Sequence, residues 1–243
     1  MEGEGRSHGR DAGTMRPVSL ERAVSRYAEG SCLASFGETR VLCTVSVEDG
    51  VPPWKKGRGE GWITAEYAML PRATHTRSAR ERDKPQGRTQ EIQRLIGRSV
   101  RAMVDDFSWG EYTLKVDCDV MQADGGTRTA AITGASVAVV DAFDWMVRTG
   151  RLKASPVRRR VAAVSVGVID GEPRVDLDYR EDVRAGVDMN LVMSSESRFV
   201  EVQGTGEHGT FSRTELDALL ELGMRAIATL DAVQGAALLR PIG

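Results

Sequence analysis

The chain has 243 residues, of which 41% are hydrophobic and 28% are charged, and its formal net charge is −2 at pH 7. This length suits one large domain or two closely packed halves, and the apolar fraction is sufficient for a sizeable core. The near balance of charge excludes an overall basic field, so any contact with nucleic acid must come from local patches.

The start of the chain is polar and rich in glycine and lacks the apolar region of a signal peptide. We expect residues 1–15 to form a flexible N-terminal arm. No apolar run approaches the roughly 18 residues that a membrane span requires, so we expect no membrane partner.

The three cysteines are Cys32, Cys43 and Cys118. They form no C-x-x-C pair, and each lies in an apolar, strand-like run, which indicates buried free thiols. Free thiols are typical of a reducing compartment, so we expect a cytoplasmic protein.

Apolar periodicity predicts alternating strands and helices in the first half. In chain order, we expect strands over 31–36, 40–47 and 62–70, a helix over 89–106, a strand over 111–121 and a helix over 127–147. A long polar loop separates the third strand from the first helix.

The second half begins near residue 155. We expect strands over 161–169, 174–178, 187–193 and 198–203, and a final helix that follows Ser212. Asp170-Gly171 is a strong hairpin signal, and Ser212 with Glu215 forms a capping box. Both halves therefore run from strands to a helix, which predicts an α+β architecture of two similar halves.

Two common types of site are poorly supported. Gly204, Gly206 and Gly209 have the spacing of a dinucleotide-binding motif, but only one helix follows them and no second strand carries the required acid. The three histidines lie in polar or glycine-rich loops, and no G-x-S-x-G elbow occurs, which argues against nucleophilic hydrolysis.

The stretch "QADGGTRTAAITGA", residues 122–135, joins a predicted strand to a predicted helix. A helix start presents unpaired N–H groups and a positive dipole end, and glycines allow an anion to approach the backbone closely. Thr127 adds a hydroxyl group, and Arg128 adds a planar fork that suits phosphate oxygens. The stretch is therefore a candidate phosphate site, although a glycine turn before a helix also occurs without any ligand.

The loop over residues 71–88 is locally basic. Its charged residues are Arg72, Arg77, Arg80, Arg82, Lys84 and Arg88 against Glu81 and Asp83, an excess of four positive charges. Such a loop can bind a phosphate backbone, or it can simply be solvated. The triplet Arg158–Arg160 is a weaker patch that we interpret as surface.

Asp182 and Asp188 are candidate metal ligands. Alternate apolar residues place Val187 and Met189 on one face of a strand and Asp188 on the other, which solvent exposure alone would also explain. In a straight strand the two aspartates would lie about 20 Å apart, whereas a shared Mg²⁺ needs oxygens within about 2.1 Å of the ion. The chain must therefore bend between them, and residues 185–186 are where it can.

Several long stretches together resemble bacterial ribonuclease PH, from about Arg16 to the last helix. They are "GWITAEYAMLPRAT", "GRTQEIQRLIGRSVRA", "DCDVMQADGGTRTAAITGA", "EDVRAGVDMN" and "RFVEVQGTGE". The chain departs from that pattern at "HGR" near its start, where Asp-Gly-Arg is usual, and at Gly206, where alanine is more usual.

The resemblance implies a single ribonuclease PH-like domain over residues 16–243, built of two similar halves of mixed sheet and helix. It also implies a phosphate-dependent 3′-to-5′ exoribonuclease that trims tRNA precursors and other RNA 3′ ends. Inorganic phosphate is the implied co-substrate, nucleoside 5′-diphosphates are the products, and the reaction is reversible. The implied assembly is a homohexamer, a trimer of dimers.

The resemblance also implies roles for individual residues. The phosphate-binding positions fall on Arg88, Gly126, Thr127 and Arg128; the catalytic aspartates, associated with Mg²⁺ or Mn²⁺, fall on Asp182 and Asp188; the tRNA-contacting arginines fall on Arg72, Arg77 and Arg80. The alternative is a catalytically silent RNA-binding ring subunit of an exosome-like assembly. Such a subunit tends to lose the phosphate-binding and acidic residues, all of which are present here.

Overall fold

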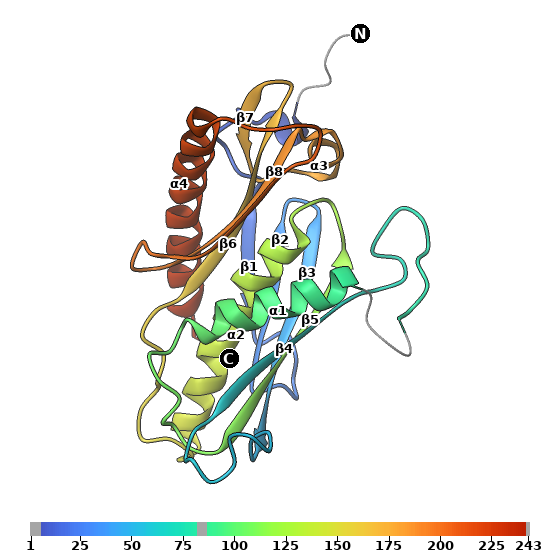
Figure 1. Cartoon of the computed structure of the whole chain (residues 1–243). Coiled ribbons are helices and arrows are strands. Elements are labelled where there is room, and N and C mark those ends of the chain that lie inside the picture. The colour runs from blue at the N-terminus through green and yellow to red at the C-terminus, as the bar shows by residue number, and fades with distance from the viewer. Residues whose placement is uncertain (1–5, 82–86, 242–243) are drawn as a thin grey trace.

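A computed structural model describes residues 6–81 and 87–241. Two sheets, each covered by a long helix, form two halves of the molecule. In Figure 1, β7, β8 and α3 lie at the top, β4 and β5 lie at the bottom, and α2 runs through the middle. The predicted α+β architecture of two similar halves is therefore confirmed.

The first sheet has the strand order β1-β2-β3-β5-β4. Its strands are β1 (Val18–Arg22), β2 (Gly30–Phe36), β3 (Thr39–Asp49), β4 (Trp62–Met69) and β5 (Tyr112–Gln122). The pairs are antiparallel except β4 with β5, which are parallel and are connected through the helix α1 (Gly87–Arg101). Because β4 and β5 are parallel, the start of α1 and the end of β5 lie at the same end of the strands.

The helix α2 (Thr127–Arg148) is the central element of the core. The free thiols Cys32, Cys43 and Cys118 lie beneath it, buried as predicted and opposite one another across β2, β3 and β5. Among the described residues, α2 alone has the length and mean hydropathy, 1.4, of a possible membrane span, and 78% of that stretch is buried inside the fold. The expectation that no apolar run reaches that length was therefore wrong. Because α2 packs between the two sheets, it is read as a core helix.

The second sheet has the strand order β7-β6-β8-β9 and is antiparallel throughout. Its strands are β6 (Val161–Ile169), β7 (Glu172–Val175), β8 (Val187–Ser194) and β9 (Phe199–Gly206), and its helices are α3 (Tyr179–Arg184) and α4 (Arg213–Leu238). One face packs on α4, where a Cβ atom at Gly223 would lie 2.1 Å from Cδ1 of Leu191. The capping box of Ser212 and Glu215 begins α4 as predicted.

Several elements differ from the sequence prediction. The helix α1 ends at Arg101 rather than residue 106, and β1 and α3 were not predicted. The strand predicted over 174–178 ends at Val175, because Asp176 adopts a left-handed φ of 54° and the chain then turns into α3.

The described part of the N-terminal arm is not a loose segment. Residues 1–5 lie outside the described residues. Residues 6–15 contain the short helix η1 (Ser7–Gly9), and the side chain of Arg10 is buried against the second half. Buried ion pairs of Arg6 and Arg10 hold this segment against the second half.

Candidate active site

The turn between β5 and α2 has the form that a phosphate site needs. Gly125 and Gly126 adopt left-handed φ values of 74° and 63°, and Gly126 is the N-cap of α2 without a side-chain capping bond. The N–H groups of the first helical turn are therefore left for another acceptor. Gly125 also has a packing role, because a Cβ atom there would lie 2.5 Å from the carbonyl oxygen of Leu177.

Thr127 lies at the bottom of this turn. Its side chain is buried, and its hydroxyl group lies 2.8 Å from the hydroxyl group of Tyr67 on β4. Burial raises the pKa of Tyr67, while the charges of Arg88 and Arg128 act to lower it. Tyr67 therefore stays protonated and orients the Thr127 hydroxyl group, a contact between β4 and α2 that the sequence did not predict.

Arg128 is held by two side chains from other elements. Its Nη1 atom donates to Oε1 of Gln203 on β9 at 3.3 Å and lies 3.6 Å from Oε1 of Glu91 on α1. Nε2 of Gln203 also donates to Oε1 of Glu91 at 2.7 Å. Gln203 and Glu91 thus orient the half-buried guanidinium group of Arg128 and leave some of its N–H donors free for an anion. The sequence did not single out Gln203 or Glu91.

Asp188 lies on the inner face of the second sheet. It shares this face with Asn190, which pairs with Ser165, and the Ser165 hydroxyl group lies 3.8 Å from the Cβ position of Gly126. The predicted division of β8 into two faces is confirmed, but the polar face points toward the start of α2 rather than toward solvent.

The chain bends between the two aspartates, as predicted. Asp182 lies on α3, which ends when Ala185 adopts an extended conformation, and Asp188 lies on β8. Burial, followed by the charge of the Asp182 carboxylate, raises the pKa of Asp188 to about 6. Asp182 is exposed at the surface of α3, where partial loss of solvent raises its pKa and the nearby charges of Arg88 and Arg128 lower it.

Two mutually repelling carboxylates with raised pKa values fit a divalent cation, whose charge would relieve the repulsion. No group of three or more His, Cys, Asp or Glu side chains within the described ranges is arranged to hold a metal ion. A cation bound between Asp182 and Asp188 would therefore take its remaining ligands from water and from a phosphate-bearing substrate, as Mg²⁺ commonly does. Glu207, whose N–H donates to the carbonyl oxygen of Gly186, adds a further negative charge nearby.

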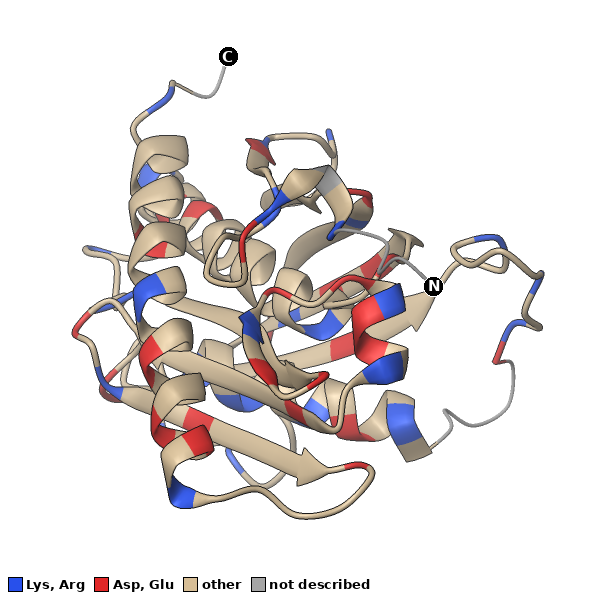
Figure 2. Ribbon diagram, turned by 90° about the horizontal axis from the view of Figure 1, so that it is seen from above, with Lys and Arg blue, Asp and Glu red and all other residues tan. Residues whose placement is uncertain are grey.

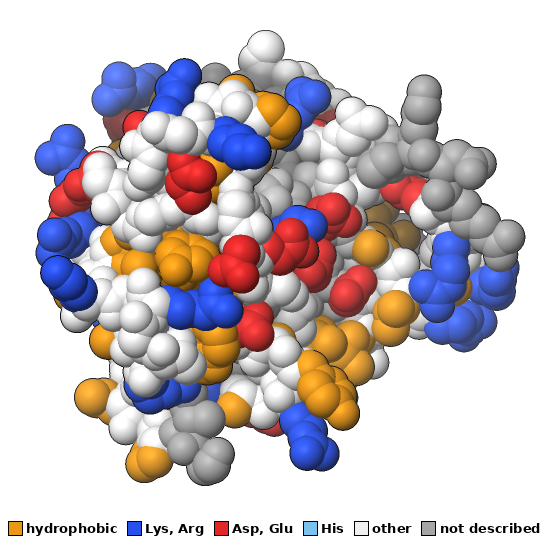
Figure 3. Space-filling view, turned by 90° about the horizontal axis from the view of Figure 1, so that it is seen from below, with side chains coloured by type: hydrophobic (Ala, Val, Ile, Leu, Met, Phe, Trp, Pro, Cys, Tyr) orange, Lys and Arg blue, Asp and Glu red, His pale blue; other side chains and the backbone are white. Residues whose placement is uncertain are grey.

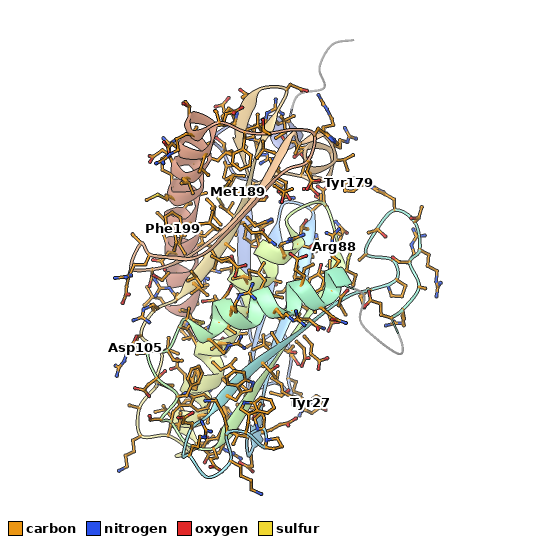
Figure 4. All side chains as sticks on the ribbon, in the orientation of Figure 1. Tyr27, Arg88, Asp105, Tyr179, Met189 and Phe199 are labelled. Atoms are coloured by element: carbon orange, nitrogen blue, oxygen red, sulfur yellow. The ribbon has the colours of Figure 1, made fainter. Side chains whose placement is uncertain are left out.

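Arg88 lies at the start of α1 with its side chain exposed, and its charge lowers the pKa values of Asp182 and Asp188. Figure 4 shows Arg88 and Tyr179 on the side of the molecule from which the loop after β4 projects. The structure thus brings together Arg88, the Gly126–Arg128 turn, Asp182 and Asp188.

Apart from Arg88, the described arginines of the basic loop lie on a projecting segment, and the ring of His75 in this loop lies 6.4 Å from the ring of Tyr179 on α3. Arg72, Arg77 and Arg80 are exposed, and basic positions are spaced along the projecting segment in Figure 2. Its base is fixed because the N–H of Ala123 donates to the carbonyl oxygen of Ala73 at 2.8 Å. The predicted basic positions Arg82 and Lys84 lie outside the described residues.

The outer face of the first sheet is acidic. Glu66 on β4 is paired with Asp117 on β5, and the pKa of Asp117 is raised by burial and then by the charge of Glu66. Acidic side chains also gather on the face of the molecule seen in Figure 3. This charge repels a phosphate backbone, whereas the loop and the cluster around α2 carry positive groups.

Two family models match the chain. The model for the 3′ exoribonuclease family, domain 1, matches residues 14–143, and the model for domain 2 of that family matches residues 159–226. The chain belongs to the 3′ exoribonuclease family. In terms of that family, Arg88 and the Gly126–Arg128 turn come from domain 1, and Asp182 and Asp188 come from domain 2.

Solved structures show the same fold at low identity. Rrp46 from rice (Oryza sativa) has a TM-score of 0.77 at 20% identity, covering 96% of this chain and 100% of that chain. The Archaeoglobus fulgidus exosome with RNA bound to the active site has a TM-score of 0.78 at 21% identity, covering 93% and 91%. An archaeal exosome core has a TM-score of 0.76 at 21% identity, covering 95% and 91%. The fold of this 3′ exoribonuclease family member is therefore that of exosome-core subunits.

Proposed function

We propose that the chain is a phosphate-dependent 3′-to-5′ exoribonuclease of the ribonuclease PH type. One observation supports this best. Two arginines and the uncapped start of α2 lie close to two carboxylates, and the negative charge of one carboxylate raises the pKa of the other. The first set suits an attacking phosphate, and the second suits a cation on the scissile phosphate.

In the proposed reaction, an oxygen of inorganic phosphate attacks the phosphorus of the 3′-terminal phosphodiester. The bond from that phosphorus to the O3′ atom of the preceding nucleotide breaks, and the proton of the attacking phosphate passes to that leaving oxygen. The products are a nucleoside 5′-diphosphate and a shortened RNA. The proton balance is met without a catalytic histidine, in agreement with a cluster built of arginines, hydroxyl groups and carboxylates.

Each residue has a distinct task in this proposal. Arg88, Arg128 and the N–H groups that follow Gly126 hold the attacking phosphate, and Gln203 aims the guanidinium group of Arg128. Asp182 and Asp188 would hold Mg²⁺ or Mn²⁺. When bound, the ion would neutralise charge that develops on the scissile phosphate and the leaving oxygen.

The test of this proposal is the dependence of RNA shortening on phosphate. A short RNA with a 3′ single-stranded tail is incubated with the protein and Mg²⁺, with and without inorganic phosphate. We expect shortening only with phosphate, and nucleoside 5′-diphosphates as the products. Equal shortening without phosphate, with release of monophosphates, would show a hydrolase instead.

The second candidate is a catalytically silent RNA-binding subunit. The observation that favours it is the fold shared with exosome-core structures over more than 90% of this chain. Against it stands the complete set of phosphate-binding and acidic residues. RNA binding without shortening under every phosphate and metal condition would favour this candidate.

Substrate and assembly are further parts of the proposal. We infer that the substrates are tRNA precursors and other RNA 3′ ends, and that the protein works as a homohexamer, a trimer of dimers, in the cytoplasm. The projecting basic loop supports an extended RNA contact beyond the reaction site, and the three buried free thiols support a reducing compartment. Light scattering on the purified protein measures the assembly directly.

Replacing Arg72, Arg77 and Arg80 together with alanine should weaken tRNA binding and lower its salt dependence by about one unit of slope per lost phosphate contact. Trimming of a short unstructured RNA should fall much less, because these side chains lie outside the reaction cluster. A matched variant that replaces the exposed Arg26, Arg148 and Arg198 removes the same charge elsewhere. Equal losses on both RNAs would place the loop in the reaction site or in folding.

A further inference from the structure

Three arginines near the N-terminus are buried in ion pairs with the second domain. The side chains of Arg6, Arg10 and Arg16 are 5%, 3% and 0% exposed, and their partners are Asp176, Asp178 and Glu181. Burying an ionised side chain is costly unless it is paired and hydrogen-bonded in good geometry. A network of six such groups therefore demands a defined arrangement of the segments that carry them.

Arg16 joins the two parts of the candidate site. Its Nε and Nη2 atoms donate to the two carboxylate oxygens of Asp176 at 3.0 and 2.7 Å. The same guanidinium group donates to the carbonyl oxygens of Asp124 and Gly125 in the turn before α2. One side chain thus connects the phosphate-binding turn with the segment that leads into α3.

Arg6 and Arg10 hold α3 itself. Nε and Nη2 of Arg6 donate to the two carboxylate oxygens of Glu181 at 2.6 and 3.0 Å, and Nη2 of Arg10 donates to Oε2 of Glu181 at 3.4 Å. Arg6 also donates to the carbonyl oxygen of Val175 at 2.7 Å. Glu181 immediately precedes Asp182, so this contact lies one residue from a proposed metal ligand.

The helix α3 needs such support because it is only six residues long. A helix this short is not stable on its own, and its capping box of Asp178 and Glu181 secures only the first turn. Glu181 serves the cap and the arginines at once, since its Oε2 atom also accepts from the N–H of Asp178 at 3.3 Å. Arg174 on β7 also donates to Oε1 of Glu181, at 3.1 Å. Together these arginines fix both the start of α3 and its rotation about its own axis.

We propose that Arg6 and Arg10 form an N-terminal clamp that positions Asp182, through Glu181, for metal binding. The inference rests on the proposed function, in which Asp182 holds the cation. The clamp residues touch neither phosphate nor metal, so they are positioning residues. Loss of the clamp lets α3 open locally, and the pair of carboxylates that binds the ion is then no longer preformed.

The test compares Arg6→Ala with Arg22→Ala. Arg22 is a matched control because it forms an ion pair with Asp141 that is nearly as buried, with side chains 11% and 3% exposed, and also binds the carbonyl oxygens of Ala237 and Leu238. Its contacts join β1 to α2 and α4, away from α3. Both variants should lower thermal stability, which shows that each removes a structural contact.

Two measurements on the RNA-free protein separate the clamp from general destabilisation. The first is hydrogen exchange of the α3 amides, such as the N–H of Asp182 that donates to the carbonyl oxygen of Asp178 at 2.9 Å. The second is Mn²⁺ affinity by electron paramagnetic resonance. Arg6→Ala should speed α3 exchange and weaken Mn²⁺ binding about tenfold or more, and Arg6→Lys should restore part of both. Arg22→Ala should leave both near the parent values.

Each outcome is decisive. Unchanged α3 exchange and Mn²⁺ affinity in Arg6→Ala, or equal changes in Arg22→Ala, would overturn the clamp while leaving the phosphorolytic proposal intact. If the parent protein binds no Mn²⁺, the proposed metal site fails and the clamp fails with it. If Arg6→Ala does not fold, Glu181→Gln is measured instead, because it removes the charge of Glu181 but keeps its size and one acceptor. Parent-like α3 hydrogen exchange and Mn²⁺ affinity in Glu181→Gln would overturn the clamp.

Discussion

Asp188→Asn should lower turnover at saturating phosphate about 100-fold or more, because the substitution keeps the size of the side chain and removes the charge that a hard cation prefers. The apparent affinity for phosphate should change much less, since Asp188 lies with the carboxylates rather than at the phosphate-binding turn. Additional Mg²⁺ should restore part of the rate, and additional phosphate should not. Steady-state titrations of phosphate and Mg²⁺ measure both effects.

The folded state of this variant can be checked through its stability. Burial raises the pKa of Asp188 to about 6, above its value in an unfolded chain, so ionised Asp188 destabilises the fold. The cost grows as the pH rises from about 4 to about 6 and is fully present above that. In buffer without divalent ions at pH 7.5, Asp188→Asn should therefore have a higher free energy of unfolding than the parent, by up to about 3 kcal/mol. Its melting temperature should rise accordingly. A stable variant that turns over like the parent would remove Asp188 from the mechanism.

Arg128→Ala should raise the phosphate concentration needed for half-maximal rate by about 10- to 100-fold, the usual effect of losing a charge-assisted hydrogen bond. Gln203→Ala should act in the same direction but more weakly, because Gln203 orients Arg128 without replacing its charge. A phosphate titration of the RNA-shortening rate measures both variants.

Arg98→Ala provides the control for this prediction. Arg98 also joins α1 to β9, through two bonds of 2.8 Å to Glu201, but it is exposed and paired outside the reaction cluster. It should leave the phosphate dependence unchanged. An equal shift in Arg98→Ala and Arg128→Ala would mean that the contact between α1 and β9, rather than the Arg128 charge, governs phosphate affinity.

The order of the main strands and helices could be predicted from the sequence because each has a clear apolar period. The alternation in residues 111–121 predicted β5, and the spacing from Ile92 to Val100 predicted the buried face of α1. Short elements escaped prediction: α3 has six residues and β1 has five, too few for a period to stand out. The end of α1 was placed too late because Met103 and Val104 are buried although they lie beyond the helix.

Only the part of the site that has a clear local pattern could be predicted from the sequence. The glycine turn, Arg128 and the need for a bend before Asp188 follow from local sequence and spacing. The partners that orient them do not, because Tyr67, Glu91 and Gln203 are ordinary residues whose importance comes from contacts between distant elements. Arg6 and Arg10 were assigned to a flexible arm for the same reason: their acidic partner Glu181 lies more than 170 residues away along the chain.

The row of thiols beneath α2 makes the first domain suitable for measurements of conformational opening. Burial raises the pKa of Cys32 to about 12, and the pKa of Cys43 is raised by its contact with Cys118 and by burial. Because the thiolate is the reactive species, alkylating reagents can modify these side chains only when the sheet separates from α2. The rate of alkylation under native conditions therefore reports how often this core opens, without any engineered residue.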